Sequence, residues 1–335
     1  MKTALASAQT FRAAFFRPRA KAAHQETAMV LVNLGNILSD RAEYDQAIAF
    51  YSEAIDLIVQ HPAVEQKMEA PESTLQKVWQ NLGLSYYQNQ QLELARSAWE
   101  ESLRYARQES DELAGAMVGF HLAQLEQRLG HRKKAADLYV PIAEVYQRHA
   151  FDFGIAEINQ QMGMLLMDSG KADKAREAYQ MALELFITLG LPRNMAQIYN
   201  NLAHVAFETG QFLEARDYYT HGWQLAHTHQ VPQVEGWCLI GSGAVALEFD
   251  QFEQGRHHLL EAQAIFEPLN ETGPLATIAF NQAKICQQEG DSAAALRYAK
   301  EALTLYQTLK EAKNIHAATQ LLEDISSPAK PSAMG

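Results

Sequence analysis

The sequence has 335 residues, of which 47% are hydrophobic and 20% are charged, as is ordinary for a globular protein. No run reaches the roughly 18 consecutive apolar residues that a membrane-spanning helix needs. The net charge of −12 argues against nucleic acid as a partner, because nucleic-acid affinity depends mainly on Lys and Arg side chains that neutralise phosphates. Two cysteines, Cys238 and Cys286, make no disulfide or zinc-finger framework, and free thiols suit a reducing compartment such as the cytoplasm.

Residues 1–23 differ from the rest of the chain in charge. They contain no acidic residue and carry Lys2, Arg12, Arg17, Arg19 and Lys21. If this segment is helical, one face carries Ala4, Ala8, Phe11 and Phe15. Such a pattern is typical of an organelle-targeting segment or of a helix that lies weakly on a membrane surface. The alternative is a flexible or loosely docked terminus, so residues 1–23 are treated as a segment separate from the rest.

A small residue recurs at a nearly constant interval along the chain. These anchor positions are Gly35, Gly83, Ala123, Gly163, Ala203, Gly243 and Ala283. The first step is 48 residues and every later step is 40 residues. Twelve residues after each anchor stands Ala or Gly, and sixteen residues after each of the first five anchors stands Tyr or Trp. A fixed period of this length indicates a repeat array.

Each repeat is predicted to form two antiparallel α-helices, which we call the A helix and the B helix. Four repeats have a glycine seven residues after the anchor, where a left-handed residue would end the A helix: Gly130, Gly170, Gly210 and Gly290. In repeat five we expect helices at about residues 196–208 and 212–229. Prolines fall in the connections between repeats, at Pro192, Pro232 and Pro274. We therefore expect an all-α solenoid of about seven helix pairs over residues 24–315, a capping helix over 316–325 and a disordered tail over 326–335.

The identities of the recurring residues distinguish this array from other helical repeats of similar length. The second repeat contains Trp79, Leu82, Gly83, Tyr86, Ala95 and Trp99. This pattern resembles the tetratricopeptide repeat (TPR), and the resemblance extends over residues 24–315. The long period is similar to that of kinesin light chain, Pins-type spindle adaptors and bacterial Rap-type regulators. The resemblance implies a right-handed superhelical solenoid whose A helices line a concave groove.

The sequence offers no arrangement of side chains that indicates catalysis. Five histidines fall on the B helices of repeats five and six: His221, His227, His229, His257 and His258. No two of them have the i, i+4 spacing of helical metal ligands, and no Cys or carboxylate completes a ligand set. We therefore expect solvated histidines on the outer face. The sequence predicts no enzyme activity, no metal and no cofactor.

Hydrogen-bonding side chains recur two residues before the anchors. This column consists of Asn33, Asn81, His121, Gln161, Asn201, Gly241 and Asn281. An amide both donates and accepts hydrogen bonds, which suits it to hold the backbone of an extended peptide. The alternative is that these amides only cap or bridge neighbouring helices. The groove residues we expect to contact a partner are Asn33, Asn36, Asn81, Tyr87, His121, Gln161, Asn201, His204, Phe207, Trp237, Asn281 and Lys284.

These features favour a non-enzymatic scaffold or adaptor that binds a protein or peptide segment in the concave groove. Acids recur near the ends of the A helices, at Asp40, Asp168, Glu208 and Glu248, and would favour a ligand with basic residues. The alternative function is a regulatory sensor that binds a small peptide or metabolite and changes its superhelical pitch. No nucleic acid and no transmembrane contact are expected. The basic N-terminus leaves organelle targeting open as an alternative to the cytoplasm.

Overall fold

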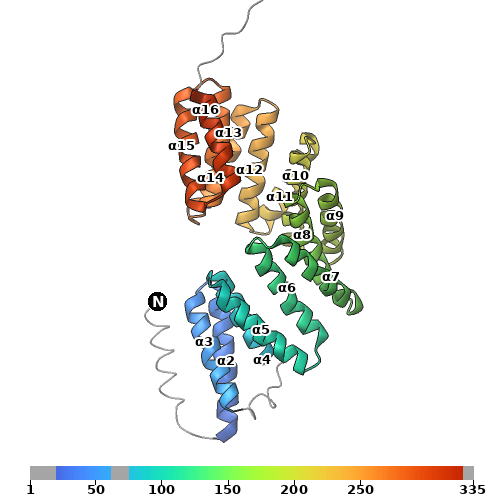
Figure 1. Cartoon of the computed structure of the whole chain (residues 1–335). Helices are drawn as coiled ribbons and strands as arrows, with labels where there is room; N and C mark the ends of the chain where they lie inside the picture. Colours follow the sequence, from blue (N-terminus) through green and yellow to red (C-terminus); the bar gives the residue numbers. More distant parts are fainter. Residues whose placement is uncertain (1–19, 62–74, 327–335) are drawn as a thin grey trace, which may run out of the picture. The chain divides into compact units, whose positions relative to one another are not determined.

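The computed structural model describes residues 20–61 and 75–326. The basic segment up to residue 19, most of the first long connection and the tail from residue 327 lie outside the described residues. Within the described ranges the chain forms fifteen α-helices and no strand (Figure 1). The predicted all-α repeat fold of seven helix pairs and one further helix is confirmed. The chain divides into two compact units, Met1–Gly154 and Ile155–Gly335, which are described separately.

The first unit contains three helix pairs. They are α2 (Ala20–Asp40) with α3 (Tyr44–Gln60), α4 (Leu75–Gln88) with α5 (Leu92–Gln108), and α6 (Glu112–Arg128) with α7 (Arg132–Arg148). The core runs between the helices, and its largest fully buried side chains include Trp99, Tyr51 and Tyr139. Each of these three rings occupies the aromatic position that the sequence period predicts. The aromatic column is therefore core.

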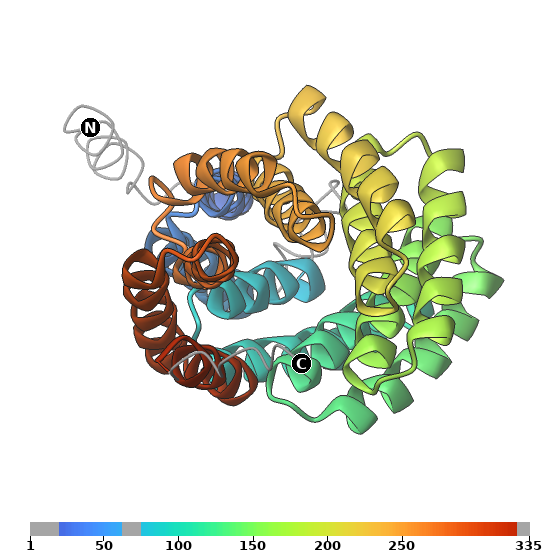
Figure 2. The same cartoon turned by 90° about the horizontal axis from the view of Figure 1, so that it is seen from above.

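The second unit contains four helix pairs and a final helix, which follow one another in a curved row (Figure 2, green to dark red). The helices are α8 (Asp152–Asp168), α9 (Ala172–Thr188), α10 (Pro192–Glu208), α11 (Phe212–Thr228), α12 (Pro232–Glu248), α13 (Phe252–Phe266), α14 (Thr272–Gln288), α15 (Ser292–Leu309) and α16 (Ala312–Ser326). The first turn of α8 precedes the division between the units. The last helix buries Ala318 and Leu321, and thereby covers apolar surface that the final pair would otherwise expose.

The small anchors exist because aromatic rings lie against them. A Cβ atom added to Gly83 would approach the indole of Trp99 to 2.5 Å, and one added to Gly163 would approach the ring of Tyr179 to 2.5 Å. A ring can also pack against the following repeat. That arrangement occurs for Tyr219, whose ring fills the place that a Cβ on Gly241 of the next A helix would need. The glycines at 83 and 163 instead fit the ring of their own repeat.

Left-handed residues end the helices at a regular spacing. Positive φ occurs at the four predicted glycines and at further turns within and between repeats. Every twentieth residue from 90 to 310 has a positive φ: Gln90, Ser110, Gly130, Ala150, Gly170, Gly190, Gly210, Gln230, Asp250, Asn270, Gly290 and Lys310. The sequence analysis named four of the five left-handed glycines and missed Gly190, which lies between two repeats. It named none of the other residues, because a left-handed residue other than glycine leaves no clear compositional signal. The two kinds of turn, within a repeat and between repeats, therefore end their helices in the same way.

The prolines begin helices instead of lying in the connections. Pro192 and Pro232 occupy the first turn of α10 and α12, so the A helix of repeat five begins at residue 192 and not near 196 as expected. Proline fits this place because the first N–H groups of a helix have no partner inside the helix and the ring fixes a helical φ. Pro274 is likewise the third residue of α14, which begins at Thr272.

Candidate functional site

The predicted column of amides is not uniform in exposure. Asn33 is exposed, Asn81 and Asn201 are partly buried, and Asn281 is only 7% exposed. Asn81, Asn201 and Asn281 were all expected to contact a partner, but Asn281 is buried and offers little surface for such a contact. The repeat period fixes the place of a residue along its helix, but the packing of the neighbouring helices decides how much water reaches it.

Two of the predicted groove residues in the first unit hold neighbouring repeats together. The hydroxyl of Tyr51 donates a hydrogen bond of 2.7 Å to Oδ1 of Asn36, and Nδ2 of Asn81 donates one of 3.0 Å to the same oxygen. Burial raises the pKa of Tyr51, so its hydroxyl keeps the proton that it donates. Asn36 and Asn81 thus make the bridge between helices that was the alternative to peptide binding.

Tyr87 and His121 lie on either side of the buried Trp99. The ring of His121 stacks on the indole at a centroid distance of 5.3 Å, and that of Tyr87 lies 5.6 Å away and tilted. Burial lowers the pKa of His121, which favours the neutral imidazole. Its ring nitrogens lie 3.3 Å from Gln80 Nε2 and 3.4 Å from Gln124 Oε1. Both predicted residues therefore contribute to packing in the first unit.

The second unit presents one partly exposed face on each of its four A helices. We define the A-helix face as the residues at intervals of four, three and four along these helices: Glu157, Gln161, Met164 and Asp168 of α8; Gln197, Asn201, His204 and Glu208 of α10; Trp237, Gly241, Ala244 and Glu248 of α12; and Thr277, Asn281, Lys284 and Gln288 of α14. Such spacing places four side chains in line on one side of a helix. Five of the predicted groove residues belong to this face and are at least partly exposed: Gln161, Asn201, His204, Trp237 and Lys284.

His204 is accessible to water and yet surrounded by protein. Its side chain is 58% exposed, but burial lowers the pKa of the imidazole. The carboxylate of Glu208 raises this pKa and the charge of Lys313 on α16 lowers it. The side chain of His204 is thus exposed, while nearby protein removes part of its hydration.

The A-helix face of the second unit is acidic. Asp168, Glu208 and Glu248 are all exposed, and Lys284 is the only Lys or Arg among the residues of this face. Glu157, which the sequence interpretation did not select, lies on α8 among them, and burial raises its pKa to about 7. A carboxyl with this pKa is poised to lose its proton when a cation approaches. No local pattern in the sequence distinguishes Glu157 from an ordinary surface glutamate.

Aromatic residues near the face differ in how much they could offer a ligand. Trp237 is 37% exposed, and its ring makes an edge contact with Phe266 at a centroid distance of 5.8 Å. The indole is thus packed against one ring and still accessible to a ligand. Phe207, in contrast, packs against Phe212 at 5.4 Å in the turn of repeat five. Trp237 is therefore the better candidate for an apolar contact.

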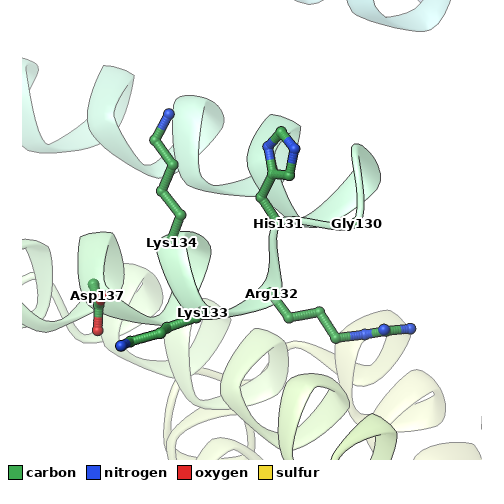
Figure 3. Close-up of a pocket in the computed structure, with 6 residues that line it drawn as sticks. All are labelled: Gly130, His131, Arg132, Lys133, Lys134 and Asp137. Carbon is green, nitrogen blue, oxygen red and sulfur yellow. The ribbon is translucent and has the colours of Figure 1, made fainter.

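A shallow recess of about 720 Å³ lies at the turn between α6 and α7 (Figure 3). It is lined by Gly130, His131, Arg132, Lys133, Lys134 and Asp137. In Figure 3 the side chains of His131 and Lys134 point to the same side. Both are engaged by the buried carboxylate of Glu126, at 2.7 Å and 2.9 Å. The recess is thus the outer part of a structural ion cluster, and it carries no predicted groove residue.

The histidines of α13 correct one part of the sequence interpretation. Nδ1 of His257 and Nδ1 of His258 lie 3.4 Å and 3.8 Å from Oε2 of Glu261. A carboxylate therefore lies close to both histidines, which the search by histidine pairs alone missed. Within the described ranges, these three residues form the one group of three or more such side chains close enough to share an ion.

Comparison with protein families matches three segments of the chain to the tetratricopeptide repeat: residues 27–61, 76–109 and 154–225. A comparison with curated proteins gave no match. No helix in the described part of the chain is long and apolar enough to span a membrane.

Similar solved structures include a gene regulator solved with a peptide and a quorum sensor. The apo form of RapI is 14% identical, with 85% of this chain and 99% of that chain covered and a TM-score of 0.65. The Rap conjugation gene regulator of plasmid pLS20, solved with the Phr* peptide, is 17% identical, with 87% and 75% covered and a TM-score of 0.62. The quorum sensor NprR from B. thuringiensis is 15% identical, with 90% and 76% covered and a TM-score of 0.58. At these identities the likeness is one of fold. Together with the three matched segments and the helix pairs described above, it identifies the chain as a tetratricopeptide repeat protein.

Proposed function

We propose that this protein is a non-enzymatic adaptor that binds a peptide segment of a partner protein on the A-helix face of its second unit. The observation that carries the proposal is the alignment of accessible side chains on four successive A helices, with the half-exposed Trp237 among them. A peptide that lies across these helices would contact a row of side chains at similar depths. Binding of this kind needs no catalytic group and no cofactor.

The chemistry of the face favours a peptide that carries Lys or Arg. Asp168, Glu208 and Glu248 supply negative charge, and charge complementarity speeds association and selects partners. Glu157 is partly buried and its pKa is raised to about 7, so a cation beside it would gain a desolvated carboxylate as partner. Charge-assisted hydrogen bonds of this type are stronger than those between neutral groups.

Backbone contacts would come from the amides that remain available. Gln161 and Asn201 are partly exposed and occupy the same place on successive A helices. Their side chains would donate to the C=O groups and accept from the N–H groups of an extended segment. Asn33, His121 and the bridged pair Asn36 and Asn81 belong to the first unit, where only Asn33 of these four is fully exposed. The second unit is therefore the stronger candidate.

The similar Rap regulator was solved with a peptide, and this supports a peptide as the ligand class here. It also favours the second candidate function, a regulatory sensor that changes its superhelical pitch when a small peptide or metabolite binds. A sensor should become measurably more compact in small-angle X-ray scattering when the ligand is added, whereas a static adaptor should not. For either function we propose a cytoplasmic location.

The proposal is tested with peptides selected from a random display library against the full chain. The selected peptides should be enriched in Lys and Arg. Calorimetry then compares wild type with the variant Gln161→Ala, Asn201→Ala, Trp237→Ala. Two amide hydrogen bonds at about 0.5–1.5 kcal/mol each and one aromatic contact of about 2 kcal/mol predict an affinity loss of at least about 100-fold.

The matched control changes two amides and one apolar residue on the B helices: Gln180→Ala, Gln224→Ala and Leu260→Ala, all of which are exposed. This variant should bind like wild type. Equal affinity of the A-helix-face variant and wild type, with both folded by circular dichroism, would exclude this face as the binding site. A library selection without basic residues would contradict the proposed charge preference.

A further inference from the structure

His257, His258 and Glu261 bring three donor atoms together on one turn of α13. The two Nδ1 atoms lie 3.4 Å and 3.8 Å from the same carboxylate oxygen, Oε2 of Glu261. One ligand atom from each of the three residues lies within 4.8 Å of those of the other two. His257 and Glu261 stand four residues apart, so their side chains lie on the same side of the helix. His258 adds the third donor from the adjacent position.

The Nδ1 atom of His258 is buried and has no hydrogen-bond partner among the residues that the structure describes. Its distance of 3.8 Å from Glu261 is too long for a hydrogen bond. The other ring nitrogen of His258 lies 3.4 Å from Nε2 of Gln254. Buried polar atoms without a partner are rare, because each one costs free energy. A bound ligand or ion would supply the interaction that this nitrogen lacks.

We propose that His257, His258 and Glu261 bind a divalent zinc ion. Two imidazole nitrogens and one carboxylate oxygen are a donor set that zinc uses in proteins. Bonds of about 2.0–2.2 Å in a tetrahedral arrangement place ligand atoms roughly 3.3–3.6 Å apart, close to the two distances observed here. The ligand atoms of the three residues, now within 4.8 Å of one another, would move closer by side-chain rotation to share one ion. The fourth position would hold water or a ligand from a partner.

The surroundings of His258 also suit the proposed ion. The neutral imidazole is the form that binds a metal. Gln254 lies at the second ring nitrogen of His258, where its amide oxygen would accept an N–H after rotation of the amide. Such an outer contact would fix the tautomer that leaves Nδ1 free for the ion.

The site is open to solvent and separate from the proposed peptide site. The side chain of His257 is 70% exposed and that of Glu261 is 50% exposed, so an ion can enter directly. Both belong to a B helix, whereas the peptide proposal concerns A helices. The zinc proposal and the peptide proposal can therefore be tested independently.

The experiment uses the untagged full chain, freed of metal by dialysis against a chelator, and titrates it with ZnCl₂ in a calorimeter. We expect one ion per chain at micromolar affinity. Glu261→Gln and His257→Gln should each weaken binding at least tenfold. The control His221→Gln removes an exposed histidine from the neighbouring α11 and should bind zinc like wild type.

Cobalt provides a second readout, because Co²⁺ in a site with two imidazoles and a carboxylate absorbs visible light more strongly than the hydrated ion. Wild type and His221→Gln should show this absorption, and Glu261→Gln should not. Glu261 is half exposed, so its variant should keep the helical circular dichroism spectrum of wild type. Binding that is unchanged in Glu261→Gln and His257→Gln, or the absence of binding at 1:1 stoichiometry in wild type, would overturn the proposal.

Discussion

Glu126 near the end of α6 is the acid whose removal should cost the protein most. Its side chain is 2% exposed, and it accepts hydrogen bonds from Arg96 at 2.6 Å, His131 at 2.7 Å and Lys134 at 2.9 Å. These partners come from α5, from the turn after α6 and from α7. The substitution Glu126→Gln keeps the shape of the side chain and removes its charge, so it isolates the electrostatic contribution of the cluster.

The pKa of Glu126 gives the expected size of the effect. Burial alone would raise the pKa of this carboxyl, but the hydrogen bonds from Lys134, Arg96 and His131 outweigh it and lower the pKa from 4.5 to about 2. At roughly 1.4 kcal/mol per pKa unit, the folded state favours the carboxylate by about 3 kcal/mol. His131 and Lys134 are more than half exposed, so solvent screens their contributions to this free energy. We therefore expect a loss of about 2–3 kcal/mol.

Urea denaturation of wild type and Glu126→Gln at several pH values measures this loss. A carboxyl with a depressed pKa in the folded state contributes its stability fully above the unfolded pKa, near 4.5, and loses it as pH falls towards 2. The difference between the two proteins should therefore be constant from about pH 7 to pH 5 and should shrink steadily below that.

The control for this experiment is Glu112→Gln on the same helix. Glu112 pairs with Arg148 at 2.5 Å, but the two side chains are 52% and 61% exposed. An exposed pair contributes about 0–1 kcal/mol, so this variant should remain close to wild type. Equal stability of Glu126→Gln and Glu112→Gln at pH 7, or a difference from wild type that does not depend on pH, would refute the reasoning.

Three further predictions concern the second unit. Ala215 is fully buried, so Ala215→Glu should lower the free energy of unfolding by several kcal/mol through overpacking and charge burial, and an unchanged melting temperature would contradict the repeat register. Gln230 has φ 55°, so Gln230→Gly should raise stability by about 0.5–1 kcal/mol, whereas Gln224→Gly inside α11 should lower it by about 1 kcal/mol, both measured by urea denaturation. The pKa of Glu157 is near 7, so affinity for a Lys-containing peptide should rise between pH 6 and 8 in wild type, and a rise of the same size in Glu157→Gln would speak against this carboxyl.

Much of the fold follows from the sequence because packing imposes the period. The anchors at 83 and 163 are glycine because rings lie 2.5 Å from where a Cβ would be, a clash that excludes even alanine at these two places. The left-handed glycines of the turns are visible because glycine adopts this conformation without strain. Pro192 was misplaced because proline is common both in connections and at the start of a helix.

The candidate site was less predictable, because exposure depends on neighbours distant in sequence. Asn201 and Asn281 occupy the same place in their repeats, yet Asn281 is buried. The side-chain hydrogen bond between Asn36 and Asn81 joins two different repeats, and no local sequence pattern indicates it. Glu157 was missed because the residue type alone does not show whether a carboxyl group is solvated or desolvated.

The left-handed residues that recur at a regular spacing from Gln90 to Lys310 place two turns of one kind a helix pair apart along this part of the chain. Most helices from α5 to α15 are equally long, and each helix in this range is followed by a turn with a left-handed residue. A segment that is removed or duplicated between two turns of one kind, such as Gly170 and Gly210, would leave the flanking helices joined by an unchanged turn. Recombination can therefore lengthen or shorten the array in steps of one helix pair. The junction would then keep an existing type of turn.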